Sequence, residues 1–304
     1  MRVSIALQTV LLICLFAAAA VGQQMADPQF DARVENPAYV KNFPRVLFDE
    51  AHNNLDNTHG RYKPFVDLLF NDGYHLTVNR QPFTKALLGP VKILVIVNPL
   101  GGEDVDDDGA DAPAFTNAEC EAVSEWVKNG GALLFIVDSG PFASAAEILA
   151  TGLGVEMSKS ELTSATAEAK ELEYAGAIVY SRQNHSLSEH SIINGRSETE
   201  RVNRVIVFGG QTLKGPNGSE ALLKVPAPLD KKTAEQPKTE VPFTGAQAIA
   251  FRLGKGRVVM LGDAAMMSAQ VRGADNKPFG MNLPDIDNRQ LVLNIMHWLS
   301  GLLK

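Results

Sequence analysis

Four short apolar runs in this sequence each end in a polar side chain that can take part in chemistry. In chain order, these polar residues are Asp49, Asn98, Asp138 and Asp263. A carboxylate can act as an acid, a base or a metal ligand, and an amide can hydrogen-bond to a polar ligand. Apolar, β-branched runs bounded by Gly, Pro and Asn predict buried strands. If these strands are parallel, the four side chains meet at one edge of a sheet, which is where open α/β sheets bind ligands.

The first of these positions has two imidazoles after it. Asp49 and His52 are catalytic candidates, because a carboxylate beside an imidazole can work as a general base with an orienting partner. The same pair could hold a divalent metal. Asn53 and His59 are candidate ligand contacts in the same loop. The alternative is local: Asp49 and Asn53 cap the loop, and His52 packs beneath it.

The turn after the third run places a carboxylate and a hydroxyl between a strand and a helix. Asp138 is the third catalytic candidate, and Ser139 is a candidate ligand contact. A serine on a strand-to-helix turn resembles a nucleophile elbow, but Val137 and Pro141 stand where that motif has small residues. The alternative is that Asp138 or Ser139 simply caps the helix.

The last run leads into a region rich in amides. Asp263 ends the run, and Asn282, Asn288 and Gln290 follow before and within the C-terminal helical pattern. Small residues and amides suit a polar ligand such as a sugar or a carboxylate. Asn288 also lies where a helix cap is the ordinary explanation.

An acidic loop carries half of a calcium-binding pattern. Asp104, Asp106 and Asp108 alternate before Gly109, as in the first half of a calcium loop. The twelfth position holds Phe115 instead of the bidentate glutamate. The sequence therefore predicts either a weak calcium site or a solvated acidic loop. A divalent metal is the only cofactor that the sequence suggests.

Helical and extended patterns alternate along the chain and would position these side chains. The clearest strands end in the four polar residues, and a capping box at Thr116 and Glu119 begins a helix. Residues 246–253 and 257–261 around Gly254 predict a hairpin. The predicted helices are residues 60–71, 117–128, 143–151 and 288–303. This order predicts an α/β fold: a mostly parallel sheet flanked by helices, with a C-terminal hairpin and helix.

The first residues have the features of a targeting segment. A basic start, an apolar stretch and a small-x-small site before Gln23 predict a secretory signal peptide over residues 1–22, cleaved near Gly22. An uncleaved N-terminal anchor is the alternative. Residues 23–43 predict a polar tether, and residues 44–304 a single domain. We therefore expect an exported protein, periplasmic or extracellular, without a membrane span once the signal is removed.

Composition narrows the classes of partner. The chain has 304 residues, 45% of them hydrophobic, and a formal net charge of −7 without a basic cluster, which argues against nucleic acid. Of its two cysteines, Cys14 lies in the predicted signal peptide, so the mature chain would have no intrachain disulfide. The oligomeric state is not determined by these features.

Several segments together resemble a known family. They are residues 48–52, 130–138, 256–266 and 287–301. As a set they are similar to an uncharacterised family of exported bacterial proteins with a class I glutamine-amidotransferase-like, flavodoxin-like domain, which also occurs in gliding-motility and transport-associated proteins. The resemblance covers about residues 43–303 and implies a flavodoxin-like sheet. Glutaminases use a cysteine on the strand–helix turn, where this chain has Asp138 and Ser139, so glutaminase activity is not expected.

Three functions remain open at this point. The first is a ligand-binding or accessory module of the cell envelope for a small polar molecule, glycan or peptide. The second is a hydrolase, with Asp49 or His52 as base and with Asp138 and Asp263 orienting water or a metal. The third is a structural envelope protein whose polar residues are caps. All three depend on where the strand-end side chains lie.

Overall fold

The computed structural model describes residues 24–162, 174, 176–225 and 245–304, and the predicted signal peptide at residues 1–22 lies outside them. A nine-stranded sheet runs through the centre in the order β3-β2-β4-β5-β12-β11-β9-β6, with β10 paired to β11. Its strands are β2 (Arg45–Asp49), β3 (His75–Asn79), β4 (Ile93–Val97), β5 (Ala132–Ile136), β6 (Glu156–Met157), β9 (Leu213–Lys214), β10 (Glu220–Lys224), β11 (Ala246–Leu253) and β12 (Gly256–Leu261).

Five neighbouring strands of this sheet are parallel. They are β3, β2, β4, β5 and β12, and in their register Leu134 of β5 pairs with Val95 on one side and Val259 on the other. The predicted hairpin is confirmed, because β11 pairs antiparallel with β12. The predicted mostly parallel α/β fold with a C-terminal hairpin and helix is therefore confirmed.

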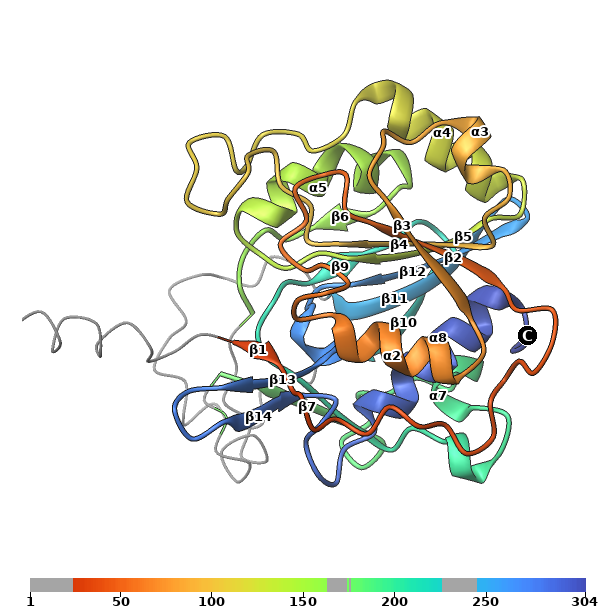
Figure 1. The fold of residues 1–304 in the computed structure, drawn as a ribbon, viewed down its shortest axis with the longest axis vertical. Helices are drawn as coiled ribbons and strands as arrows, with labels where there is room; N and C mark the ends of the chain where they lie inside the picture. The colour runs from red at the N-terminus through yellow and green to blue at the C-terminus, as the bar shows by residue number, and fades with distance from the viewer. Residues whose placement is uncertain (1–23, 163–173, 175, 226–244) are drawn as a thin grey trace, which may run out of the picture.

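Helices cover both faces of the sheet, because the central strands are apolar on both sides (Figure 1). On β4, Ile93, Val95 and Val97 pack into one core, and Leu94 and Ile96 pack into the other. The first core also contains side chains of α2 (Lys63–Asn71) and α8 (Asn288–Ser300). The second contains side chains of α3 (Lys85–Leu88), α4 (Asn117–Lys128) and α5 (Pro141–Gly152). Such near-continuous apolar strands are typical of a sheet buried on both faces.

Two smaller sheets lie outside the central one. One pairs β7 (Ile178–Ser181) with β8 (Arg204–Val207), and a short helix, α7 (Ser191–Asn194), lies between them in the chain. The other joins β1 (Met25–Ala26), β13 (Ala269–Arg272) and β14 (Lys277–Gly280). Sequence patterns did not predict the β1-β13-β14 sheet.

The segment predicted as a polar tether packs against the domain instead. Met25 pairs with Val271, and the Tyr39 hydroxyl donates a hydrogen bond to Ser300 Oγ at 2.8 Å. The Ala38 amide donates to the Asp72 carboxylate at 2.8 Å. Polar residues at 24–43 are anchored by hydrogen bonds to distant parts of the chain, which a search for apolar periodicity does not detect.

Candidate functional site

The carboxyl ends of the parallel strands hold two polar clusters rather than one. Asp49 is the last residue of β2, and Asn98 and Asp138 follow β4 and β5 after at most two residues. Asp263 comes just after β12. We call the first group the His52 cluster, made of Asp49, His52, Asn79 and Glu119. The second is the Asn98 cluster, made of Asp56, Asn98, Asp138 and Asp263.

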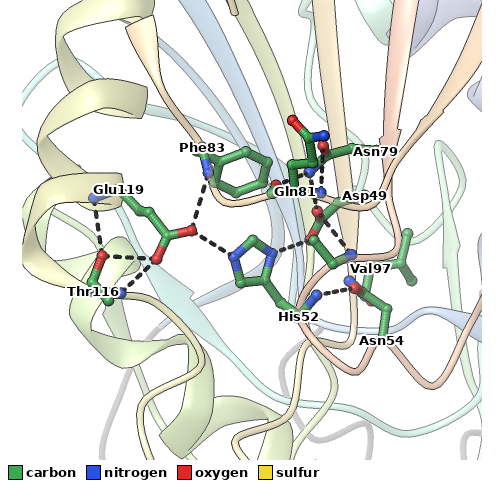
Figure 2. Close-up of polar contacts among 10 residues, drawn as sticks. Asp49, His52, Asn54, Asn79, Gln81, Phe83, Val97, Thr116 and Glu119 are labelled. Atoms are coloured by element: carbon green, nitrogen blue, oxygen red, sulfur yellow. Dashed lines mark hydrogen bonds and ion pairs between the residues drawn. The ribbon is translucent and has the colours of Figure 1, made fainter. Parts of the chain in front are cut away.

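The imidazole of the His52 cluster lies between two carboxylates (Figure 2). His52 Nδ1 is 2.7 Å from Asp49 Oδ2, and Nε2 is 2.9 Å from Glu119 Oε1. The rings of Phe83 and Phe115 pack against it, with centroids 4.7 and 4.6 Å away. Only 7% of His52 is exposed. Both ring nitrogens are thus occupied, and the imidazole is closed off from a substrate.

Further hydrogen bonds fix both carboxylates of this cluster. Asn79 Nδ2 donates to Asp49 Oδ1 at 2.9 Å, and the Phe83 amide donates to Glu119 Oε1 at 3.0 Å. The predicted capping box is confirmed, because Glu119 N donates to Thr116 Oγ1 and Thr116 N donates to Glu119 Oε2. One glutamate therefore caps α4 and also binds the histidine of the β2 loop.

Burial and hydrogen bonding act in opposite directions on the two partners. Burial lowers the pKa of His52, but its bonds to Asp49 and Glu119 outweigh burial and raise that pKa above its usual value. Burial raises the pKa of Glu119, but bonds from Thr116 and His52 bring it down to about 2. The cluster therefore favours an imidazolium bound to ionised Glu119.

The amide of Asn98 holds two carboxyl groups of the second cluster. Asn98 Nδ2 donates to Asp56 Oδ2 at 2.9 Å and to Asp138 Oδ2 at 2.8 Å. In return, the Asp138 amide donates to Asn98 Oδ1 at 2.8 Å. The Ala264 amide donates to Asp138 Oδ1 at 2.8 Å, which ties the end of β12 to the end of β5. Asn98 adopts a positive φ of 42°, which asparagine tolerates better than most residues.

Three carboxyl groups gather here, and the positive charge of Arg61 acts on two of them, Asp56 and Asp138. Burial and the charge of Asp138 raise the pKa of Asp56 to about 6 and that of Asp263 to about 7. Burial also raises the pKa of Asp138, and the hydrogen bonds from Asn98 and Ala264 and the charge of Arg61 oppose the increase. Carboxyl groups that change charge near neutral pH can serve as acids or bases. Asp56 and Asp263 are buried, whereas Asp138 is partly exposed.

A cavity of about 340 Å³ lies beside these clusters. It is lined by loop residues that follow β2 and β4: Glu50, Asn53, Asn54, Leu55, Asn57, Leu100, Glu103 and Asp104. The loop is anchored to the sheet, because Asn54 Nδ2 donates to the Val97 carbonyl at 2.9 Å. The Leu55 amide donates to the Asn98 carbonyl at 3.1 Å, so the cavity wall continues into the Asn98 cluster.

The other predicted residues lie in separate places. His59 is exposed, and Ser139 is partly exposed beside Asp138. Asn282 donates to Asp27 and to the Gln270 carbonyl, both at 2.8 Å, so it ties the N-terminal segment to β13. Asn288 is fully buried and bonds to the backbone of Ile206. Gln290 lines a different cavity, described below.

The acidic loop does not form a cation site within the part of the chain that the structure describes. No group of three or more His, Cys, Asp or Glu side chains there is arranged to hold a metal ion. Asp104 and Asp107 belong to one turn, in which the Asp104 amide donates a hydrogen bond to Asp107 Oδ2 at 2.8 Å. Asp104, Asp106 and Asp108 are thus not gathered around one point, and the calcium site stays a prediction: alternate carboxylates converge only when the whole loop, including its twelfth residue, folds around the ion.

Sequence reasoning missed three members of these clusters. Asp56 lies in a loop between patterned segments, and Asn79 ends an edge strand that gave only a weak signal. Glu119 was explained fully by its helix cap, which left no reason to seek a second partner. The available signal was the position of Glu119 in a helix that leads directly into a strand. Because Glu119 and His52 are far apart in the sequence, their contact could not be inferred from it.

Within the described ranges, no helix is both long and apolar enough to cross a membrane.

No family model matches the chain, and no curated protein matches its sequence. Solved structures do match. One, described as the mmIFT52 N-terminal domain, has a TM-score of 0.58 and 15% identity, covering 84% of this chain and 97% of that one. Another, the cytoplasmic protein STM3548 from Salmonella typhimurium, has a TM-score of 0.50 and 14% identity, covering 84% and 98%.

A third structure is described as a ThuA-like protein from Bacteroides uniformis. Its TM-score is 0.47 at 13% identity, covering 90% of this chain and 95% of that one. That TM-score is too low to carry an argument. At such identities, the first two structures establish a shared fold and nothing about activity.

Proposed function

We propose that this protein is a ligand-binding or accessory domain that acts outside the cytoplasm and holds a small polar molecule, glycan or peptide at the carboxyl edge of its sheet. The observation that carries this proposal is the 340 Å³ cavity between the loops that follow β2 and β4. It lies where open α/β sheets generally bind their ligands.

The lining chemistry favours a ligand rich in hydroxyl groups. Asn53 offers an exposed amide donor and acceptor, whereas Asn54 and Asn57 also form hydrogen bonds within the fold. The described lining residues include acids but no basic side chain. A cavity lined by acids and without a base disfavours an anionic ligand. A neutral sugar or a short peptide segment fits the amides without placing an unpaired charge on the protein. We take sugars as the first class to test.

Asn53 offers a clean test of this proposal. It is exposed and has a positive φ of 48°, so Asn53→Gly removes the amide without straining the backbone. Asn42→Gly is the matched control, because Asn42 is also exposed at a φ of 54° but precedes β2 at the far end of the strand.

The experiment measures thermal stabilisation and calorimetric affinity with a panel of mono- and oligosaccharides and short peptides. We expect a member of the panel to raise the melting temperature, and Asn53→Gly to weaken its binding about tenfold while Asn42→Gly leaves it unchanged. Binding that ignores Asn53 would refute this location. A panel without any binder would favour the structural alternative, in which the polar residues serve as caps.

A hydrolase is the second candidate, and the Asn98 cluster favours it specifically. Asp263 and Asp56 have pKa values of about 7 and 6, and the charge of the partly exposed Asp138 contributes to raising both. Asp138, rather than the enclosed His52, would then reach the substrate. Hydrolysis of a bound sugar or peptide by the intact protein, lost in Asp138→Asn, would support this candidate, and a chelator would reveal any need for a metal.

The finer family assignment belongs to this proposal as well. We propose that the chain belongs with exported bacterial proteins that carry a glutamine-amidotransferase-like domain, on the basis of the segments around Asp49, Asp138 and Asp263. The predicted signal peptide at residues 1–22 supports an exported location. Mass spectrometry of the protein recovered from a bacterial periplasm would reveal whether residue 23 is its N-terminus.

A further inference from the structure

A second cavity lies at the opposite edge of the sheet from the candidate site. Its volume is about 520 Å³, which is within the usual range for small-molecule sites. It is bounded by residues 31–36, by Asp72 just after α2, by residues 196–200, and by α8. Asp72 precedes β3, so this cavity is near the edge where the parallel strands begin.

Most charged groups around this cavity are paired with one another. Asp31 and Glu200 each accept more than one hydrogen bond from an arginine, and Asp72 Oδ2 lies 2.7 Å from His297 Nε2. The three pairs are Arg33 with Asp31, Arg196 with Glu200, and His297 with Asp72. These pairs leave two charged lining residues, Arg289 and Glu35.

Among the residues that the structure describes, Arg289 has no carboxylate partner. Its Nη2 donates to the Arg33 carbonyl at 2.6 Å, and no carboxylate of the described chain forms an ion pair with it. Burial lowers its pKa, and the charges of Asp31, Asp72 and Glu35 oppose that effect from a distance. A guanidinium matches a carboxylate in two parallel hydrogen bonds, and this geometry is unused here.

His297 supplies a second, independent observation. It lines the cavity and is only 2% exposed, and its Nδ1 has no hydrogen-bond partner among the described residues. Buried polar atoms are nearly always hydrogen-bonded in folded proteins, so an orphaned one calls for a partner. His297 is therefore an incompletely satisfied polar side chain in the wall of this cavity.

We propose that this cavity binds a small zwitterion of the amino-acid class, with its carboxylate on Arg289 and its ammonium group facing Glu35. Two leftover charges of opposite sign match the two charges of such a ligand. A dianion such as phosphate would face four acidic lining residues, and a bare metal cation would face three arginines. This site is distinct from the carboxyl-edge cavity and does not depend on the function proposed there.

The test uses the full chain and measures affinity for the common amino acids, for acetate and for inorganic phosphate by calorimetry. Arg289→Gln removes the carboxylate partner and should weaken amino-acid binding at least about tenfold. Glu35→Gln changes an exposed side chain, so the variant should fold, and the experiment stays decisive even if Arg289→Gln fails to fold. It should weaken amino acids about tenfold and leave acetate unchanged.

Glu121→Gln is the control, because Glu121 is an exposed carboxylate on α4, on the other face of the sheet. It should change none of the affinities. The proposal is overturned if no amino acid binds at millimolar concentration, if phosphate binds more tightly than every amino acid, or if both Arg289→Gln and Glu35→Gln bind like the unaltered chain.

Discussion

His52 shows how the surroundings of a residue decide its role. Its sequence neighbours suggested a general base, but both ring nitrogens are bonded to carboxylates and two phenylalanine rings cover it. A base must reach the proton that it removes. The imidazole instead joins the loop after β2 to the start of α4, so its first role is to hold these two elements together.

We therefore expect His52→Ala to act on stability. Removing the imidazole leaves Asp49 and Glu119 buried without their shared partner, and breaking a buried pair in this way costs about 3–5 kcal/mol of unfolding free energy. Denaturant unfolding measures this loss. His59→Ala, in the same loop but exposed, should stay within about 0.5 kcal/mol of the unaltered chain. A stable His52→Ala protein that no longer binds ligand would instead restore a functional role for this residue.

At the scale of elements, Gly210 and Gly262 allow the segment after β8 to pass close to the end of β12, beside the Asn98 cluster. The Gln211 amide donates to the Gly262 carbonyl at 2.9 Å, and a Cβ on Gly210 would lie 1.8 Å from that carbonyl oxygen. Gln211 Nε2 then donates to the Val137 and Asp138 carbonyls at 3.0 and 3.1 Å. The close crossing thus places Gln211 against the end of β5 and supports the turn that carries Asp138.

Gly210→Ala should consequently be far more damaging than an ordinary glycine substitution. Both Gly210 and Gly218 have positive φ, at 79° and 86°, but a Cβ on Gly218 meets nothing within 4 Å. Gly218→Ala should cost only the backbone strain, about 1 kcal/mol, whereas Gly210→Ala adds a clash with backbone atoms. The difference between the melting temperatures of the two variants measures the destabilisation caused by the clash at Gly210. Equal losses would mean that the segment after β8 moves aside freely.

For the whole molecule, three buried groups make stability depend on pH in the same direction. The folded-state pKa values of Asp56 and Asp263 are about 6 and 7, above their ordinary value of 3.8, and that of His52 is also raised. A group with a raised folded-state pKa contributes its full stabilisation below the unfolded value and loses it as pH rises through the folded value. Glu119, whose folded-state pKa of about 2 lies below its ordinary value of 4.5, contributes fully above that ordinary value and loses its contribution as the pH falls toward 2.

The free energy of unfolding should therefore be larger at about pH 5 than at about pH 8, and chemical denaturation across this range measures the difference. Asp56→Asn keeps the bond from Asn98 and removes the buried charge, so it should stabilise the protein at the higher pH and flatten the dependence below about pH 6. Asp111→Asn, which changes an exposed carboxylate, should leave the curve unchanged. Stability that rises from pH 5 to pH 8 would contradict the assigned protonation states.

The sequence by itself determined the four central strands that end in polar side chains, the C-terminal hairpin and the cap of α4, because these features follow from local periodicity and local hydrogen bonding. Only the tertiary structure decided which of those side chains meet. It joined Glu119 to His52 across 67 residues and brought Asp56 into hydrogen-bond contact with Asn98. It also packed residues 24–43 against α8 and created the cavity around Arg289. Such contacts depend on how helices and loops pack over the sheet, and no short stretch of sequence encodes that packing.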